Sequence, residues 1–382
     1  GMNAPLALER GELQWVVQRY LLVKLVILAA AVAGFWLPFG RGLAEENFVY
    51  REPDPVSLAD RFTPFDGQWY VQIAEAGYQV QPRYADQSNL NFFPLYPALM
   101  AVISPIAGGT RNAGLAVSYL AGFAAAVLLY LLARCDFPAL VAQRTVWYWL
   151  IFPTAVVLSA VYSEALFLAL AIGALLAGRS RRFGLAALLG VLAALTRSVG
   201  VFLFFPLVVQ YAAAVGWRLP GWLRAMAIYL VIPAATLAYL AYVAAVSGEL
   251  GAYREIVANG WKVRLTWPGA ALFDWSGREL FGYRNGLLDW FFGVAFLLLL
   301  LPVSRRLPLP YAAYALAFTL LPLSLDTTMS LTRYLLVSWP HFLFLAQLPL
   351  LRSSAWHWPL TASLLGMLVS FTLRFTTWSW IG

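Results

Sequence analysis

The chain has 382 residues, of which 62% are hydrophobic and only 12% are charged. A soluble globular protein carries about 25% charged residues, so this composition excludes an ordinary soluble domain. The net charge of +8 comes from arginines scattered between apolar segments, which does not fit the single basic face of a nucleic-acid-binding protein. We therefore predict an all-α polytopic membrane protein.

The apolar segments, taken in chain order, predict about eleven membrane-spanning helices. A span needs about 20 apolar residues, or somewhat fewer when the helix is short. The predicted spans cover residues 16–38, 113–133, 145–161, 164–178, 183–194, 199–215, 225–246, 287–303, 311–323, 334–351 and 359–371. Residues 91–108 are also apolar, but Pro94, Pro97 and Pro105 interrupt them, so we interpret this segment as interfacial or partly re-entrant.

The loops between these spans differ in charge from one side to the other. One set of loops holds ten arginines and a single acid, Asp136; the arginines are Arg134, Arg144, Arg179, Arg181, Arg182, Arg218, Arg224, Arg305, Arg306 and Arg352. The positive-inside rule places these loops on the inner side and the acid-rich residues 39–90 on the outer side. We expect one membrane-embedded domain over residues 1–382, with outer loops 39–112 and 247–286 forming the functional face.

Residues 65–79 predict an amphipathic helix that lies on the membrane surface within the first outer loop. One face carries Gln68, Gln72, Glu75 and Gln79, and the other carries Trp69, Ile73 and Ala76. Asp66 stands at the start of this helix. Its carboxylate could accept the free amides of the first turn as an N-cap, or act as a general base. The spacing leaves both roles open.

Three further features combine polar groups with the ends of spans. Glu164, in the turn Tyr162-Ser163-Glu164, either begins a helix or belongs to a site. Arg197 and Arg333 fall on the arginine-poor side, so each either snorkels to the interface or forms a bidentate phosphate clamp. The aromatic and proline-rich residues 91–97 are either an interface anchor or a rigid wall for a sugar or lipid.

The second outer loop mixes aromatic and charged side chains suited to stacking on a glycan and bonding to it. They are Tyr253, Trp261, Lys262, Arg264, Trp267, Asp274 and Trp275. The chain has two histidines, His341 and His357, and shows no metal-ligand spacing, P-loop or GxGxxG motif. We expect no metal or other cofactor, although Asp66 and Glu164 could hold a divalent cation between them.

Five segments resemble, in order, the motifs of PIG-V-type mannosyltransferases. They are FDGQWYVQIAEAGY at 65–78, FFPLYP at 92–97, YSEALF at 162–167, ALTRSVG at 194–200, and RYLL at 333–336 followed by Pro340. Each motif is weak alone, but the set in this order is specific. Phe65 departs from the family's usual Trp, and Ser198-Val199 replaces a pair that commonly contains Pro.

The resemblance implies a GT-C bundle with a catalytic carboxylate in the first outer loop, which by position is Asp66. It implies transfer of a sugar, mannose in this family, with inversion, from a polyprenyl phosphate to a hydroxyl of a lipid- or glycan-linked acceptor. We expect Arg333, Arg197 and Tyr334 on the donor phosphate. Around the sugar or acceptor we expect Trp69, Tyr70, Asn91, Tyr96, Tyr162, Glu164 and Trp261.

The resemblance also predicts where the protein works: a prokaryotic plasma membrane with the site facing outward, or the endoplasmic reticulum lumen in a eukaryote. The main alternative is a non-enzymatic transporter or flippase of lipid-linked sugars. A transporter would more naturally show internal repeats and mid-membrane charges than acids at one surface. A scaffold subunit, a third possibility, would not need Asp66 at all.

Overall fold

The computed structural model describes residues 8–37, 56–79 and 87–381, and within them the regular structure is helical. The α-helices are α1 (Arg10–Ala33), α2 (Leu58–Arg61), α3 (Asp66–Ala76), α4 (Leu95–Ala107), α5 (Thr110–Arg134), α6 (Ala139–Leu150), α7 (Glu164–Arg179), α8 (Phe183–Ala194), α9 (Phe204–Val215), α10 (Leu219–Tyr229), α11 (Val231–Ser247), α12 (Ala252–Glu255), α13 (Leu287–Arg306), α14 (Leu309–Leu323), α15 (Leu331–Leu335), α16 (Pro340–Gln347), α17 (Pro349–Arg352) and α18 (Ser354–Thr376). Shorter turns are η1 (Gly34–Trp36), η2 (Asn89–Asn91), η3 (Pro153–Ser159), η4 (Ser198–Leu203), η5 (Ile256–Gly260) and η6 (Ala270–Phe273).

Several of these helices are long and apolar enough to cross a membrane. In the described part of the chain, six stretches qualify by length and composition, and a seventh if η3 and α7 count as one bent span. The six are Arg10–Trp36, Thr110–Arg134, Ser198–Val215, Leu219–Ser247, Leu287–Arg306 and Ser354–Thr376, beside three shorter apolar helices, α4, α8 and α14. The chain is therefore a multi-pass integral membrane protein, while the number of eleven spans stays a prediction.

Two of the predicted spans are not continuous helices. The segment 145–161 breaks where α6 ends and Pro153 opens η3, and η3 meets α7 at 94°. The segment 334–351 divides among α15, α16 and α17, with Pro340 and Pro349 at the starts of the last two. Proline lacks the amide donor and clashes with the preceding turn, so it favours such breaks. Between these breaks, the short helix α15 packs against η3.

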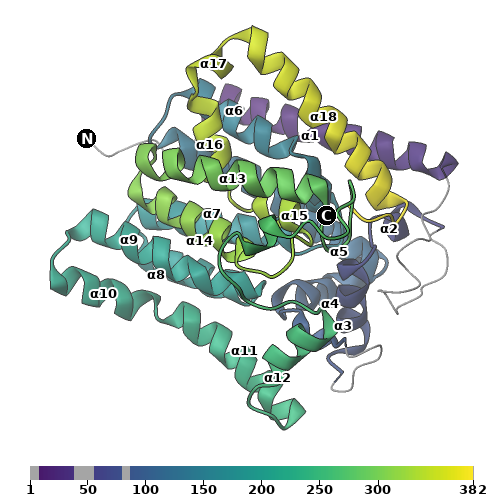
Figure 1. Cartoon of the computed structure of the whole chain (residues 1–382). Helices are drawn as coiled ribbons and strands as arrows, with labels where there is room; N and C mark the ends of the chain where they lie inside the picture. The colour runs from purple at the N-terminus through teal and green to yellow at the C-terminus, as the bar shows by residue number, and fades with distance from the viewer. Residues whose placement is uncertain (1–7, 38–55, 80–86, 382) are drawn as a thin grey trace.

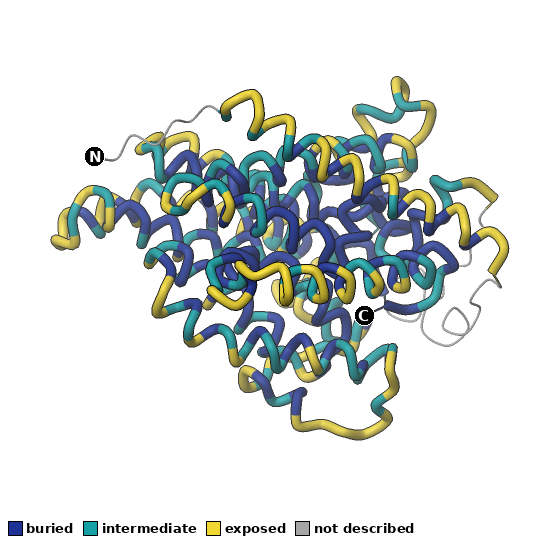
Figure 2. The backbone as a smooth tube through the Cα atoms, turned by 90° about the horizontal axis from the view of Figure 1, so that it is seen from above, coloured by how far each residue is buried: buried dark blue, intermediate teal, exposed yellow. Residues whose placement is uncertain are grey.

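The buried core lies along the middle of the bundle (Figure 2). Helix α7 is buried along most of its length and packs between α5 and α8, while α1 packs on α18 and α13 on α14. Leucines on the outer helices are left uncovered; Leu25, Leu237 and Leu298 are each more than half exposed. Hydrocarbon solvates such side chains directly, so these faces fit contact with lipid.

Helix α3 forms where the sequence predicts it, but it does not lie on a surface. Gln68 and Gln72, expected to face water, are buried, and exposure begins only at Glu75. The side-chain Nδ2 of Asn89, at the start of η2, donates to Gln72 Oε1 at 3.1 Å. This bond gives the buried Gln72 oxygen the partner that water would provide at a surface. The helix is thus inserted between η2 and α4 and is fixed on both sides.

The segments predicted to share the outer face contact one another at one end of the bundle, where α2, α3 and α4 lie (Figure 1). Gln87 Nε2 donates to the Gly260 carbonyl at 3.1 Å, and the Asp326 amide donates to the Arg264 carbonyl at 2.9 Å. Parts of the first outer loop, residues 39–55 and 80–86, lie outside the described residues. Two residues of the predicted inner loops, Arg179 and Asp136, form an ion pair where α7 and α5 end.

Cysteine labelling tests which face is outside. In a Cys135→Ala background, we expect Ser57→Cys, at the start of α2, and Ser180→Cys, at the end of α7, to react with a membrane-impermeant maleimide from opposite sides. The positive-inside rule puts the arginine-rich turn after α7 in the cytoplasm. Right-side-out and inverted vesicles would be compared. Labelling of both positions from one side would refute the predicted membrane topology.

Candidate active site

Four charged side chains from four separate segments meet at this end of the bundle. Asp66 is the first residue of α3, Glu164 the first of α7, Arg197 lies between α8 and η4, and Arg333 lies in α15. Arg333 Nη1 donates to Asp66 Oδ2 at 2.7 Å, and Arg333 Nε lies 3.6 Å from Glu164 Oε1. Arg197 Nη1 is 2.8 Å from the same Glu164 oxygen. Two acids and two arginines thus form one neutral row.

The backbone before α3 aims the Asp66 side chain at this row. Phe65 has a φ of +50°, a conformation that costs a residue with a side chain about 1–3 kcal/mol. The amides of Gly67 and Gln68 bond to the carbonyls of Pro64 and Phe65. The N-cap is Phe65, with no side-chain cap bond. The interpretation of Asp66 as an N-cap is therefore wrong, and its carboxylate is directed at Arg333.

Arg333 is fixed by partners on several sides. It follows Ser330, which adopts a left-handed φ of +59° at the start of α15. Its Nη2 donates to the Tyr334 hydroxyl at 3.2 Å, and its guanidinium lies 5.3 Å from the Tyr162 ring centroid and 5.0 Å from that of Tyr334. Cation–π contacts of this kind gain strength when water is excluded. The side chain is 9% exposed, so snorkelling to the interface does not describe it.

Arg197 reaches the row through a tight turn after α8. Its Nη1 also donates to Ser163 Oγ at 3.0 Å, and the same oxygen is 2.7 Å from the Tyr70 hydroxyl. Gly200 follows closely: a Cβ there would lie 2.4 Å from the Ala193 carbonyl oxygen. The glycine in the 194–200 motif thus lets the turn fold tightly enough to present Arg197.

Burial and neighbouring charge act in opposite directions on the two arginines. Burial disfavours the charged form of Arg333, but the Asp66 and Glu164 carboxylates outweigh it and raise the pKa of Arg333 well above its ordinary value. Burial likewise opposes the charge on Arg197, and Glu164 raises the pKa of that side chain. Both guanidinium groups therefore stay positive at every working pH.

Some polar atoms of the row have no hydrogen-bond partner. Both carboxylate oxygens of fully buried Glu164 and the Nε atoms of Arg197 and Arg333 are in this state. The pair between Arg197 and Glu164 is close at 2.8 Å but poorly aligned for a hydrogen bond. Buried polar groups left unpaired are rare in native proteins, and each calls for an explanation. An anionic or hydroxyl-bearing ligand would supply the missing partners.

The structure places some of the predicted binding residues next to the row and others away from it. Tyr162 and Tyr334 contact Arg333, and Tyr70 is linked to Arg197 through the Ser163 hydroxyl. Tyr96 is fully buried with its hydroxyl bonded to the Gly114 carbonyl at 2.9 Å, so it supports the Tyr70 ring, 5.0 Å away. Trp69 packs between Trp261 and Phe92, with its ring centroid 6.0 Å from each, in an aromatic cluster beside α3.

Asn91 lies near this aromatic cluster and not in the row. Its carbonyl accepts a long bond of 3.5 Å from the Tyr253 hydroxyl. Burial raises the pKa of Tyr253 to about 12, so that hydroxyl stays protonated and able to donate. Contacts of a sugar with Asn91, Trp69, Tyr96 and Trp261 stay predictions, and the geometry gives them less support than it gives the residues of the row.

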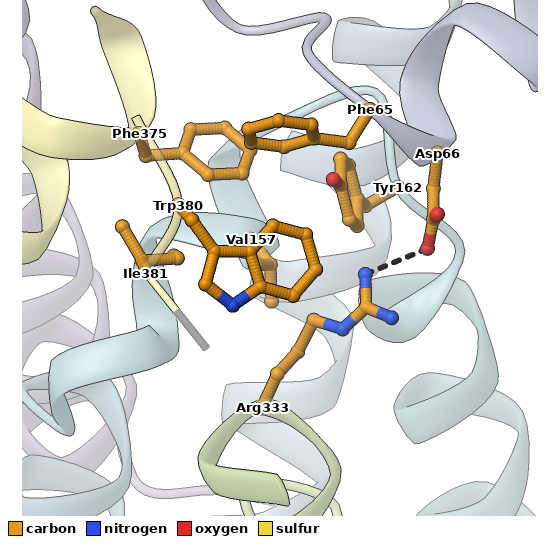
Figure 3. A pocket seen from close by; sticks show the side chains of 8 residues that line it. All are labelled: Phe65, Asp66, Val157, Tyr162, Arg333, Phe375, Trp380 and Ile381. Atoms are coloured by element: carbon orange, nitrogen blue, oxygen red, sulfur yellow. Dashed lines mark hydrogen bonds and ion pairs between the residues drawn. The ribbon is translucent and has the colours of Figure 1, made fainter. Parts of the chain in front are cut away.

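A narrow cavity opens beside the Asp66–Arg333 pair (Figure 3). Its lining residues are Phe65, Asp66, Val157, Tyr162, Arg333, Phe375, Trp380 and Ile381. One edge is charged and the rest is apolar, with the Phe65 and Trp380 rings in edge contact at 5.2 Å. Phe375, Trp380 and Ile381 belong to no motif recognised in the sequence. The lining thus places the Asp66–Arg333 pair next to a mostly apolar wall.

No group of three metal-ligating side chains occurs within the described residues. Asp66 and Glu164, the acids that could hold a divalent cation, both lie within 4 Å of an arginine nitrogen. Positive charge is therefore already present where a metal would supply it.

Comparison with known proteins finds one matching family and solved structures with a similar fold. The model of the mannosyltransferase (PIG-V) family matches residues 55–216. Among curated proteins, no sequence matches the chain. The structure is similar to crystal structures of ArnT from Cupriavidus metallidurans, in the apo state with a TM-score of 0.53 and bound to undecaprenyl phosphate with a TM-score of 0.56, both at 18% identity. Each covers 91% of this chain, which spans 62% of the length of ArnT.

Four of the five motifs lie inside the range that the family model matches, and the fifth, which begins at Arg333, lies beyond it. The ion pair between Asp66 and Arg333 joins the two parts in space. The resemblance seen in the sequence is thus confirmed: residues 55–216 match the PIG-V mannosyltransferase family, and the chain has the membrane-embedded GT-C glycosyltransferase fold.

Proposed function

We propose that this protein is a membrane glycosyltransferase that transfers mannose, with inversion, from a polyprenyl-phosphate donor to a hydroxyl of a lipid- or glycan-linked acceptor at the outer membrane face. The observation that carries the proposal is the row Asp66–Arg333–Glu164–Arg197 beside a largely apolar cavity. The family match favours mannose. Binding of undecaprenyl phosphate by ArnT, which has the same fold, supports a lipid-phosphate donor.

In the proposed reaction Asp66 takes the proton from the acceptor hydroxyl as its oxygen attacks the anomeric carbon of the sugar. The bond from that carbon to the phosphate oxygen breaks, and the lipid phosphate leaves with one more negative charge. Arg333 stabilises this charge, and Arg197 adds to the positive field. Glu164, held between the two arginines, orients the sugar or the acceptor together with Tyr162.

An inverting mechanism constrains the positions of Asp66 and Arg333 relative to the sugar. The base and the leaving phosphate must lie on opposite faces of the sugar ring, yet here the two side chains touch at 2.7 Å. A bound donor must therefore part them, with its phosphate replacing the Asp66 carboxylate as the partner of Arg333. In this scheme Asp66 becomes free to act only when the donor is in place.

The proposal is tested with purified protein in nanodiscs, polyprenyl-phosphate mannose and an extracted lipid acceptor. We expect a mannosylated lipid whose anomeric configuration, read by NMR, is opposite to that of the donor. Movement of intact lipid-linked sugar between leaflets without a transferred sugar would favour the flippase alternative. A product with retained configuration would remove the single-displacement mechanism.

We also predict that transfer does not need a divalent metal, because Arg333 and Arg197 supply the positive charge at the phosphate. Turnover should stay within about twofold of the untreated rate after EDTA treatment and gel filtration. Added Mg²⁺ or Mn²⁺ should not raise it. A rate that falls with EDTA and returns with one of these ions would place a cation at Asp66 and Glu164.

A further inference from the structure

A buried carboxylate outside the row is bonded to the residue next to Arg333. Asp289, in the first turn of α13, is 2% exposed. Its Oδ1 accepts two bonds from Thr332, one from the backbone amide at 2.7 Å and one from the hydroxyl at 2.6 Å. These partners are 43 residues apart in the sequence, and they belong to different helices.

An acid in the first turn of a helix commonly serves its own helix, by capping or by favourable interaction with the dipole. Asp289 does not cap its own helix, because both of its side-chain hydrogen bonds go to Thr332 in α15. At 2.7 and 2.6 Å, both bonds are shorter than is usual for hydrogen bonds of their type.

Thr332 is also held from the opposite side, so the position of α15 is set by several bonds. The Thr154 hydroxyl of η3 donates to the Thr332 carbonyl at 3.2 Å. Just before α15, the Thr328 amide donates to the Arg284 carbonyl at 3.1 Å, and Ser330 takes its left-handed conformation. A five-residue helix has little stability of its own, so these contacts determine where its third residue, Arg333, stands.

We infer that Asp289 is a positioning residue for the phosphate site: it locks Thr332 and thereby places the Arg333 guanidinium. The inference rests on the proposed role of Arg333 and adds to it a residue outside all five motifs and outside the range matched by the family. Within the described residues, the hydrogen bonds of Asp289 go to Thr332, and none goes to Asp66 or to a residue that lines the cavity. Its effect should therefore pass through Arg333 alone.

The experiment measures donor KM, acceptor KM, thermal stability and direct binding of undecaprenyl phosphate for the full chain in nanodiscs. We expect Asp289→Ala to raise the donor KM and the dissociation constant of undecaprenyl phosphate about tenfold, since it removes the acceptor of both bonds. Asp289→Asn, which keeps an oxygen but loses the charge, should fall between Ala and wild type. The acceptor KM should not change.

Thr332 provides the conservative series for the same contact. Thr332→Val keeps the shape but loses the hydroxyl bond, and it should weaken donor use less than Asp289→Ala does. Thr332→Ser keeps both bonds and should restore the wild-type donor KM. Glu279→Gln is the matched control: its side chain is exposed in the loop before α13 and does not line the cavity.

A merely structural role would lower thermal stability and act in any background. We therefore expect Asp289→Asn to add no further loss of undecaprenyl phosphate binding in an Arg333→Ala protein. A wild-type donor KM in both Asp289 variants, or an equal additional loss in the Arg333→Ala background, would overturn the inference. If the wild type binds undecaprenyl phosphate but transfers no sugar, the proposed function fails and the binding series still decides the role of Asp289.

Discussion

Asp66→Asn should abolish most transfer while leaving the lipid-phosphate site intact. If Asp66 is the base, turnover should fall about 10²–10⁴-fold. Asn keeps the size and a hydrogen-bond acceptor for Arg333 but cannot take a proton. Because Asp66 occupies Arg333 in the unliganded protein, the loss of its charge should leave binding of undecaprenyl phosphate as tight as in the wild type, or tighter.

This pair of outcomes separates a base from a structural acid. Glu75→Gln is the matched control, since Glu75 lies on the same helix, is exposed, and bonds to the Thr110 hydroxyl away from the row. Thermal unfolding would be recorded for both variants. An Asp66→Asn protein that unfolds like the wild type and turns over normally would remove the catalytic assignment and with it the reason to prefer an enzyme over a scaffold.

The membrane class and the order of the helices could be predicted from the sequence because they depend on local composition. A long apolar run must be helical in hydrocarbon to pair its backbone groups, so residues 113–133 and 287–303 are recovered as α5 and α13. The breaks in the predicted spans also had local signals. Pro153, Pro340 and Pro349 stand at the interruptions, where the loss of the amide donor outweighs the continuous hydropathy.

Partnerships at long range could not be predicted in the same way. The positive-inside rule marks Arg197 and Arg333 as unusual cations, but nothing in the spacing predicts that Arg333 bonds to Asp66, 267 positions away. Likewise the glutamines of α3 follow a water-facing pattern, and only the fold reveals that Asn89 replaces the water at Gln72. Hydropathy records the polarity of a side chain and not the partner that satisfies it.

The apolar wall of the cavity is the other part that could not be predicted from the sequence. Phe375 and Trp380 follow an ordinary apolar span, and aromatic residues there are expected at any membrane interface. In the structure Trp380 contacts Phe65, the residue that replaces the family's usual Trp, at 5.2 Å. The departure from the motif therefore lies at a contact between the first outer loop and the segment after α18.

Replacing Arg333 should produce the opposite pattern to Asp66→Asn, with donor binding and turnover falling together. Removing one preorganised donor to a developing oxyanion costs about 10²–10³-fold in rate, so we expect a loss of that size in kcat/KM for Arg333→Ala. Binding of undecaprenyl phosphate should weaken in the same variant. Its stability should also fall, since Asp66 and Glu164 would lose a shared cation.

Arg333→Lys tests whether a positive charge alone is enough for donor binding and turnover. Arg333 reaches Asp66, Tyr334 and the neighbourhood of Glu164 through three different nitrogens, which a single ammonium cannot reproduce. Lys should therefore recover only part of the loss. Arg254→Ala, at a strongly exposed arginine of the second outer loop, serves as the control and should behave like the wild type. In the proposed scheme the donor phosphate displaces Asp66 from Arg333, so the double variant Asp66→Asn/Arg333→Ala should bind undecaprenyl phosphate no better than Arg333→Ala alone. If the double variant regains tight binding, the phosphate sits elsewhere in the row, and Arg197 becomes the cation that holds it.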